Sequence, residues 1–443
     1  MKTNPYILAV IILSFFNLSN GQIISYELIK NWPIEEIGNL YSEYNIPESV
    51  GEINYSVDGY KVMYLTPDYD GSMVICSGAI YIPVNIGCEP PILSWSHGTI
   101  SKKSSAPSNI GNTSNDLIGV LCASHGYITL MSDLIGLGEG EGLHNYVHAK
   151  TEASATIDLI LYGKQLSSEL LGISPNDELF LFGYSQGGHT TMATVKEIEK
   201  NYSEELQITA SAPMAGPYDM SGVMKNMMNS GQPYPNPGYL PYVLFSYNKI
   251  YNLYDNINEV LIPPYNSTLF DMYDGTNSMW TINYILPEIP INIFWASYYQ
   301  DFITNTEHPM NLALIDNNVY NFTPQSPMKL LHCSGDDNVD FENSTVAYNY
   351  FIENGAQNIE LMDGGNFNHS DCAFPAIIGA KTWFDSMANL CETTGFYENS
   401  SNKNELIYNI DFLGRTLSKE IKNKNMISIY ENGIYEKKLI INN

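Results

Sequence analysis

Residues 183–187 have the pattern Gly-x-Ser-x-Gly, with Ser185 at the centre. The apolar run at 178–182 is typical of a buried strand, and residues 189–200 carry apolar side chains at helical spacing. A strand and a helix joined by this pattern predict a sharp turn that holds the serine exposed. The helix would offer its first backbone N–H groups and its positive dipole end to a negatively charged oxygen. We therefore predict that Ser185 is a nucleophile for carbonyl groups.

The nucleophile needs a base, and His369 is the best candidate. In the α/β-hydrolase fold, to which this turn belongs, the triad runs serine, acid, histidine along the chain. His369 follows a predicted strand at 358–362 and a loop, and a helix is expected after it. His308 lies in an irregular Pro-rich region and His332 within a predicted strand, so neither is expected to be the base. We predict that His369 takes the serine proton.

The acid is expected in the turn-rich segment 334–339, which follows the predicted strand at 329–333. Asp336 and Asp337 are both candidates for the carboxylate that orients the histidine ring. We prefer Asp336, because Val339 three residues later matches the Asp-x-x-Val of many members of this fold. Asp337 is then expected to be a solvated loop acid.

Two backbone N–H groups should stabilise the oxyanion that forms on the carbonyl oxygen. One is expected from Gln186, directly after the serine, and the other from the loop after an earlier strand. Residues 91–96 are predicted to form that strand, and the N–H of Thr99 is the candidate donor. His97 precedes the serine and is expected to brace this loop through hydrogen bonds.

Several motifs in the right order resemble the secretory lipases and esterases of the α/β-hydrolase fold, the group that includes fungal lipase A. The resemblance implies a carboxylic ester hydrolase with a Ser185/Asp336/His369 triad and no cofactor, acting on an ester or lipid substrate. A departure occurs at 139–141, Glu-Gly-Glu, where relatives often have another polar turn. The matching segments are 97–99, 106–108, 132–138, 142–148, 151–153, 183–189, 215–219 and 333–339.

The order of predicted elements indicates an α/β protein with a doubly wound, mostly parallel sheet. Residues 1–21 are expected to be a signal peptide, because a short apolar segment ends in small residues, with cleavage before Gln22. The hydrolase domain is expected at 22–395. An insertion rich in Tyr, Asn, Pro and Met, at about 219–327, should form a helical cap over Ser185.

Residues 396–443 alternate apolar and polar positions between Gly and Asn turns, which predicts a small β-rich module. This tail resembles the C-terminal sorting domain of the type IX secretion system of Bacteroidetes. The resemblance implies contact with that machinery and a secreted or cell-surface location. The alternative is an ordinary small β-appendage. The matched features are Asp411-Phe412-Leu413-Gly414-Arg415, Gly433-Ile434-Tyr435 and Lys437-Lys438-Leu439-Ile440.

The formal net charge of −28 argues against partners that are themselves anionic. Nucleic acids and anionic membrane surfaces would be repelled, so neither is expected to bind. We expect the chain to be a monomer.

The six cysteines permit disulfides in an exported chain. Cys333 flanks the acid loop and Cys372 follows His369, so a bridge between them would join two active-site loops. Cys76 and Cys88 bracket a predicted hairpin at 75–83 and are expected to pair. Cys122 is expected to be a buried helix residue.

Two other functions remain open at this point. Aminopeptidases of the same fold use the same triad, so the motifs alone do not separate them from esterases. The chain could also be a catalytically silent surface-binding protein that keeps the scaffold. The apolar composition of the insertion favours ester substrates.

Overall fold

The computed structural model describes residues 23–47 and 50–391, together with four strands of the tail. The predicted signal peptide at 1–21 and its cleavage site before Gln22 lie outside the described residues. No helix in the described part of the chain is long and apolar enough to cross a membrane.

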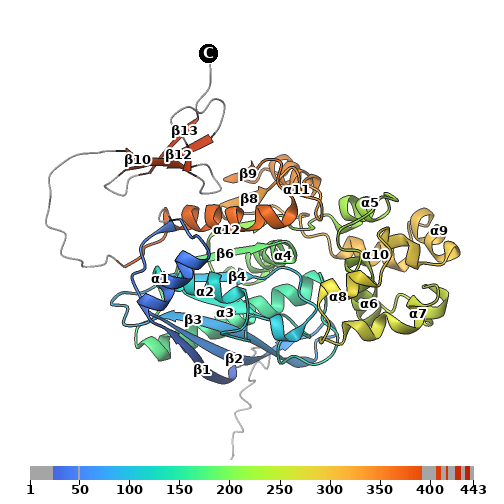
Figure 1. Ribbon diagram of the computed structural model, residues 1–443, viewed down its shortest axis with the longest axis horizontal. Helices are drawn as coiled ribbons and strands as arrows, with labels where there is room; N and C mark the ends of the chain where they lie inside the picture. The colour runs from blue at the N-terminus through green and yellow to red at the C-terminus, as the bar shows by residue number, and fades with distance from the viewer. Residues whose placement is uncertain are drawn as a thin grey trace, which may run out of the picture.

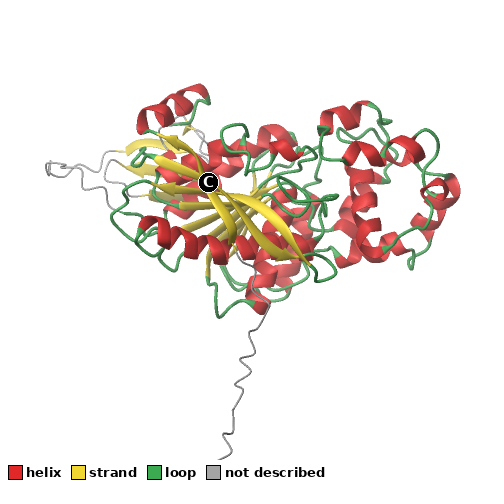
Figure 2. Ribbon diagram, turned by 90° about the horizontal axis from the view of Figure 1, so that it is seen from below, coloured by secondary structure: helices red, strands yellow, loops and turns green. Residues whose placement is uncertain are grey.

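A nine-stranded sheet forms the centre of the molecule, in the order β1-β2-β3-β5-β4-β6-β7-β8-β9 (Figures 1 and 2). The strands from β5 to β9 in that order pair in parallel, whereas β1, β2, β3 and β5 pair antiparallel. The predicted doubly wound, mostly parallel sheet is therefore confirmed. Its strands are Ile23–Trp32 (β1), Val57–Pro67 (β2), Met73–Pro83 (β3), Ile92–Ser96 (β4), Ile128–Ser132 (β5), Leu179–Tyr184 (β6), Ile208–Met214 (β7), Met328–His332 (β8) and Ile359–Asp363 (β9).

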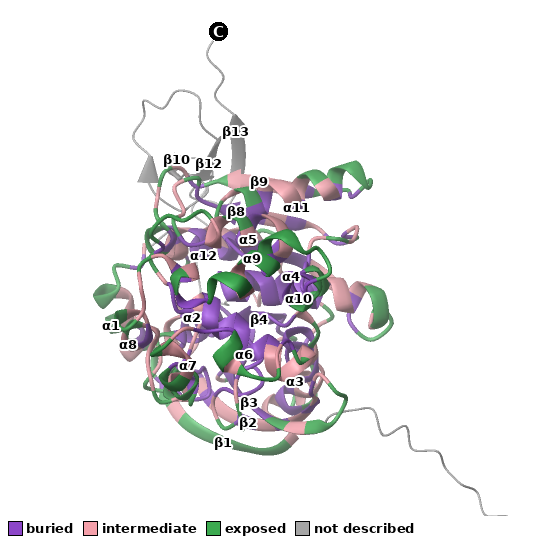
Figure 3. Ribbon diagram, turned by 90° about the vertical axis from the view of Figure 1, so that its right-hand side faces the viewer, coloured by how far each residue is buried: buried purple, intermediate pink, exposed green. Residues whose placement is uncertain are grey.

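Helices cover both faces of this sheet. Every residue of β4, β5 and β6 is buried, as expected for strands that helices cover on both faces; Figure 3 shows this for β4, which is purple. One face packs against Ile34–Glu43 (α1), Asn115–Ser124 (α2) and His369–Asp385 (α12). The other face packs against Ala149–Leu171 (α3), Gln186–Asn201 (α4) and Glu342–Glu353 (α11).

The segment between β7 and β8 has its own hydrophobic core and lies to one side of the sheet (Figure 1). It consists of short helical elements. The longest helix ends at Tyr251, because Asn252 adopts a left-handed conformation with φ of 54°. The helical elements are Met220–Met224 (η3), Lys225–Met228 (α5), Tyr239–Tyr251 (α6), Ile257–Glu259 (η4), Tyr265–Thr268 (α7), Phe270–Tyr273 (η5), Met279–Tyr284 (α8), Pro290–Ile293 (η6), Ala296–Thr304 (α9) and Pro309–Asp316 (α10).

The cysteine pairing differs in part from the expected one. Cys333 and Cys372 form the predicted disulfide, but Cys88 bonds to Cys391 rather than to Cys76. The predicted hairpin at 75–83 is wrong, because these residues belong to the single strand β3. Cys76 lies within β3, roughly 23 Å of extended chain before the end of the strand, and no turn brings it back toward Cys88, which lies beyond that end. Cys76 is a free buried thiol, as is Cys122, which lies in α2 as expected.

The tail contains a second sheet, with four antiparallel strands in the order β11-β10-β12-β13. The β-rich character predicted for this part of the chain is confirmed. The strands are Leu406–Ile410 (β10), Thr416–Leu417 (β11), Asn425–Tyr430 (β12) and Tyr435–Leu439 (β13).

Candidate active site

Ser185 occupies a sharp turn between β6 and α4. Its φ of 62° and ψ of −122° lie in a region that side-chain-bearing residues rarely adopt. The turn is possible because its neighbours are small. A Cβ on Gly183 would lie 2.3 Å from the carbonyl oxygen of Gly187, and one on Gly187 would lie 1.9 Å from that of Ser96. The strained turn predicted from the sequence is therefore present.

The loop after β4 lies directly beside this turn. A Cβ on Gly98 would lie 3.8 Å from Cβ of Ser185, so the backbone of the loop approaches the serine closely. The side chain of Thr99 is fixed by a 2.9 Å hydrogen bond between its Oγ1 and the Tyr146 hydroxyl. His97 braces the loop, as expected, because its two ring nitrogens face the backbone carbonyls of Gly98 and Asp133.

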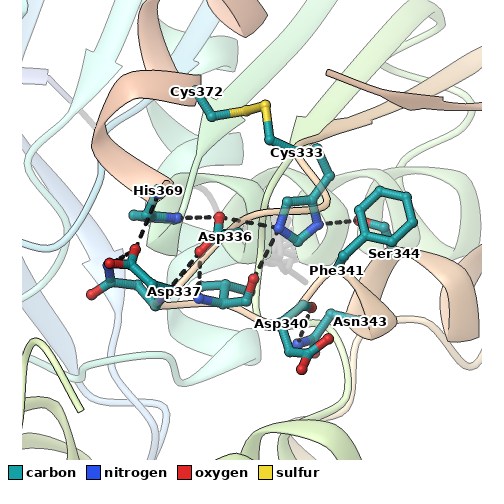
Figure 4. A network of polar contacts seen from close by, with 12 residues as sticks. Cys333, Asp336, Asp337, Asp340, Phe341, Asn343, Ser344, His369 and Cys372 are labelled. Carbon is teal, nitrogen blue, oxygen red and sulfur yellow. Dashed lines mark hydrogen bonds and ion pairs between the residues drawn. A yellow bond between two sulfur atoms is a disulfide. The ribbon is translucent and has the colours of Figure 1, made fainter. Parts of the chain in front are cut away.

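Asp336 follows β8 and contacts the ring of His369 (Figure 4). Its Oδ2 lies 2.5 Å from His369 Nδ1, and its Oδ1 accepts the backbone N–H groups of Asn338 and Val339 at 2.9 and 2.8 Å. Burial acts to raise the pKa of Asp336, but hydrogen bonds and histidine charges outweigh it and hold this pKa below its ordinary value. Asp336 is therefore an ionised acceptor for His369.

Asp337 contacts His369 in a different way. Its Oδ1 accepts the backbone N–H of His369 at 3.2 Å and a side-chain N–H of Asn338 at 2.8 Å. This carboxylate therefore fixes the main chain of His369, whereas Asp336 contacts the ring. Of the two candidate acids, only Asp336 has the geometry to select the imidazole tautomer.

His369 begins helix α12, and its position is fixed from both sides. Its carbonyl oxygen accepts the Tyr184 hydroxyl at 2.7 Å, and the two rings lie 4.9 Å apart. With Nδ1 directed at Asp336, the other ring nitrogen, Nε2, remains available to a substrate or a nucleophile. The residue is largely buried.

One wide cavity brings the predicted residues together. Ser185, His369, Gly98 and Thr99 all line it, and it is open to solvent. We call it the open cavity. Ser185 also lines a second, narrower cavity, together with Gln186 and residues of the helical insertion. We call this one the apolar cavity.

Residues 107–390 match the family model described as "Secretory lipase", which covers more than half of the chain. The chain belongs to the secretory lipase family.

Solved structures agree with this assignment. The chain is 27% identical to a proposed hydrolase from Legionella pneumophila, with a TM-score of 0.75 over 82% of this chain and 97% of the other. It is 26% identical to the rice cell wall degrading esterase LipA from Xanthomonas oryzae, with a TM-score of 0.73 over 83% and 98%. Candida antarctica lipase A, at 16% identity and a TM-score of 0.62 over 82% and 81%, shares the fold. No curated protein matches the chain in sequence.

The family and the Xanthomonas oryzae esterase support the hydrolysis of ester substrates. They also support the predicted α/β-hydrolase fold.

His332 is a contact of the acid that the sequence did not indicate. It is fully buried at the end of β8, and its Nε2 lies 2.9 Å from the Val339 carbonyl and 3.1 Å from Asp336 Oδ2. A carbonyl only accepts, so Nε2 carries a proton and donates to both oxygens. The other nitrogen lies 2.8 Å from the Ser344 hydroxyl. Asp336 Oδ2 is thus shared by two histidine rings, of which His369 lines the open cavity.

We expect His332→Leu to lower kcat about tenfold and leave KM nearly unchanged, because the lost hydrogen bond positions Asp336 rather than substrate. His332→Gln keeps a side-chain N–H and should retain more of the rate. Steady-state kinetics and unfolding midpoints of both variants test this. An unchanged kcat in folded His332→Leu would show that His332 has no part in positioning the acid.

A second buried network lies behind the first turn of α4. The Gln186 side chain donates to Glu152 Oε1 and to His144 Nε2, both at 2.8 Å, and Glu152 Oε2 contacts His189 Nδ1 at 2.6 Å. Burial acts to raise the pKa of Glu152, but the charge and hydrogen bond of His189 outweigh it, so this pKa is lowered. Burial lowers the pKa of His144 to about 4, so its ring is a neutral acceptor. These contacts fix the side chain of Gln186, whose backbone N–H is predicted to bind the oxyanion.

The disulfide between Cys333 and Cys372 joins the segments that carry the acid and the base (Figure 4). Replacing both cysteines by serine should lower the free energy of unfolding by about 2–4 kcal/mol and also lower kcat, because the two segments lose their covalent link. Urea unfolding and kinetics test this. Cys88→Ser with Cys391→Ser is the matched control and should lower stability without changing kcat. Equal kcat values in both double variants would contradict the role of the link.

Proposed function

We propose that this protein is exported and cleaves carboxylic esters through an acyl-enzyme on Ser185, with His369 as base and Asp336 as acid. The observation that carries the proposal is the 2.5 Å contact between Asp336 and His369 Nδ1, beside a cavity that His369 shares with Ser185. This arrangement leaves Nε2 as the proton acceptor.

In the first half-reaction, the Ser185 hydroxyl proton moves to Nε2 of His369 as Oγ bonds to the carbonyl carbon. The oxyanion is held by the backbone N–H groups of Gln186 and Thr99. The tetrahedral intermediate then breaks its bond to the alcohol oxygen, which leaves with the proton from Nε2. In the second half-reaction, water gives a proton to Nε2 and attacks the acyl-enzyme. The acid is released and Ser185 regains its proton.

The cavities favour an ester over a peptide with a free amino terminus. Among the residues that line the open and apolar cavities, none is Asp or Glu in the described part of the chain. An aminopeptidase needs carboxylates to bind the ammonium group of its substrate. An esterase has no such need, and the apolar cavity suits an acyl chain.

Kinetics with p-nitrophenyl esters of increasing acyl length, beside aminoacyl p-nitroanilides, test this function. We expect turnover of the esters and at most a trace with the anilides. Preference for the anilides would favour an aminopeptidase, and turnover of neither would favour a silent binding protein. The apolar cavity predicts that activity falls once the acyl chain exceeds its capacity.

We further propose that residues 1–21 direct export and that the tail is an address for type IX secretion. Two disulfides and the family support an oxidising location. The tail motifs support the proposed role in type IX secretion. Expression in a host with that system, with and without residues 396–443, tests this role. Equal release of both chains into the medium would argue for an ordinary β-appendage.

A further inference from the structure

The apolar cavity contains a single charged side chain. Its lining is dominated by apolar residues of the helical insertion, among them Met220, Met224, Leu240 and Phe302. Lys225 is the one Lys, Arg, Asp or Glu among the described lining residues. The residue is only partly buried, so its ammonium group keeps part of its hydration and is accessible to an anion.

The surroundings of Lys225 leave its charge uncompensated. Its Nζ donates to Asn311 Oδ1 at 2.7 Å and lies 4.9 Å from the centre of the Phe302 ring. The Asn311 amide group is itself fixed, because its nitrogen donates to two backbone carbonyls at 2.8 Å. In the described part of the chain, no carboxylate lies within 4.0 Å of Lys225 Nζ. An ammonium group has three N–H donors, so two remain for a ligand.

Asn229 adds a second polar group to the same wall. It follows Lys225 by four residues at the end of α5, so both side chains lie on one face of the helix. Both residues line the apolar cavity. The Asn229 Oδ1 is buried and has no hydrogen-bond partner among the described residues. The polar atoms of this wall are therefore the N–H donors of Lys225 and one unused acceptor, Asn229 Oδ1, so only Lys225 can bind an anion here.

The proposed chemistry assigns the two cavities to the two parts of an ester. The leaving alcohol takes its proton from His369, and His369 lines the open cavity but not the apolar one. The alcohol part therefore occupies the open cavity. Ser185 lines both cavities, so the acyl part extends from Ser185 into the apolar cavity, where Lys225 lies.

We propose that the apolar cavity is a binding site for acyl chains whose far end carries a carboxylate, held by the ammonium group of Lys225. The substrates are then half-esters of dicarboxylic acids, with an apolar stretch between ester and carboxylate. The carboxylate supplies the missing counter-ion of Lys225, and the methylene groups fill the apolar wall. This inference rests on the proposed function, because it takes the acyl group to be bound to Ser185.

The test compares mono-p-nitrophenyl adipate with p-nitrophenyl hexanoate, which have acyl chains of equal length. We expect the ratio of their kcat/KM values, adipate over hexanoate, to fall at least about tenfold in Lys225→Met, since a hydrogen bond between charged groups is lost. Lys225→Arg should retain most of the ratio. Lys200→Met, an equal change of charge at an exposed position on α4, is the control and should not change it.

A second measurement separates this inference from the proposed reaction. Adipate should raise the unfolding midpoint of the wild type more than hexanoate does, and this difference should vanish in Lys225→Met. If neither ester is cleaved but adipate still stabilises through Lys225, the reaction is wrong and the binding site stands. An unchanged kcat/KM ratio in Lys225→Met, or equal stabilisation by the two acids, would overturn the binding site.

Discussion

Ser185→Ala should lower kcat for p-nitrophenyl esters by about 10⁵-fold or more, because no acyl-enzyme can form. The variant should remain folded. Ser185 contributes one hydroxyl to the turn, whereas the turn itself depends on the glycines at 183 and 187 and on the hydrogen bond from the Ser185 N–H to the Met214 carbonyl. Steady-state kinetics and an unfolding curve measure both parts of this expectation.

His369→Ala should have an effect of the same size, because the serine proton then has no acceptor. His97→Ala is the matched control, since both nitrogens of that ring face backbone carbonyls. His97→Ala should lower kcat less than His369→Ala does, because it weakens a loop and removes no proton acceptor. Retained turnover in either Ser185→Ala or His369→Ala would refute the assigned triad.

Asp336→Asn should lower kcat by about 10⁴-fold, because the amide no longer selects the tautomer that leaves Nε2 free. The neighbouring Asp337→Asn is the control. An asparagine there can still accept the backbone N–H of His369, so we expect less than about a tenfold loss. A larger loss in Asp337→Asn than in Asp336→Asn would reverse the choice of acid.

Ionisation of Asp336 should also affect the free energy of unfolding. Its pKa in the folded protein is below the unfolded value, so the ionised carboxylate contributes stability above about pH 4. That contribution is lost as the pH falls below this value toward the folded pKa. The difference in unfolding free energy between wild type and Asp336→Asn should therefore shrink from pH 5 to pH 3. A constant difference would mean that ionisation of Asp336 is not coupled to folding.

Local patterns predicted those parts of the site that depend on neighbours in sequence. The turn at Ser185 needs small residues on both sides, and these can be read directly from the chain. The preference for Asp336 came from Val339, and the structure gives a physical reason for it. The Val339 N–H binds the Asp336 carboxylate at 2.8 Å, so the spacing of the two residues is that of a closed turn.

Contacts between distant segments were not predictable in the same way. The partner of Cys88 is Cys391, 303 residues away, and no local spacing indicates such a pair. His332 read as an ordinary strand residue, because its contact with Asp336 depends on how the chain turns after β8. The sequence around Lys225 did not indicate that it lines a cavity, because its contacts come from helices α9 and α10, which are distant in sequence.

The proposed mechanism depends most on the reactivity of the Ser185 hydroxyl group. Labelling the intact protein with a fluorophosphonate and mapping the modified peptide tests it directly. We predict a single adduct on Ser185, which is lost in Ser185→Ala and strongly slowed in Asp336→Asn. An unmodified Ser185, or an adduct on another serine, would contradict the account.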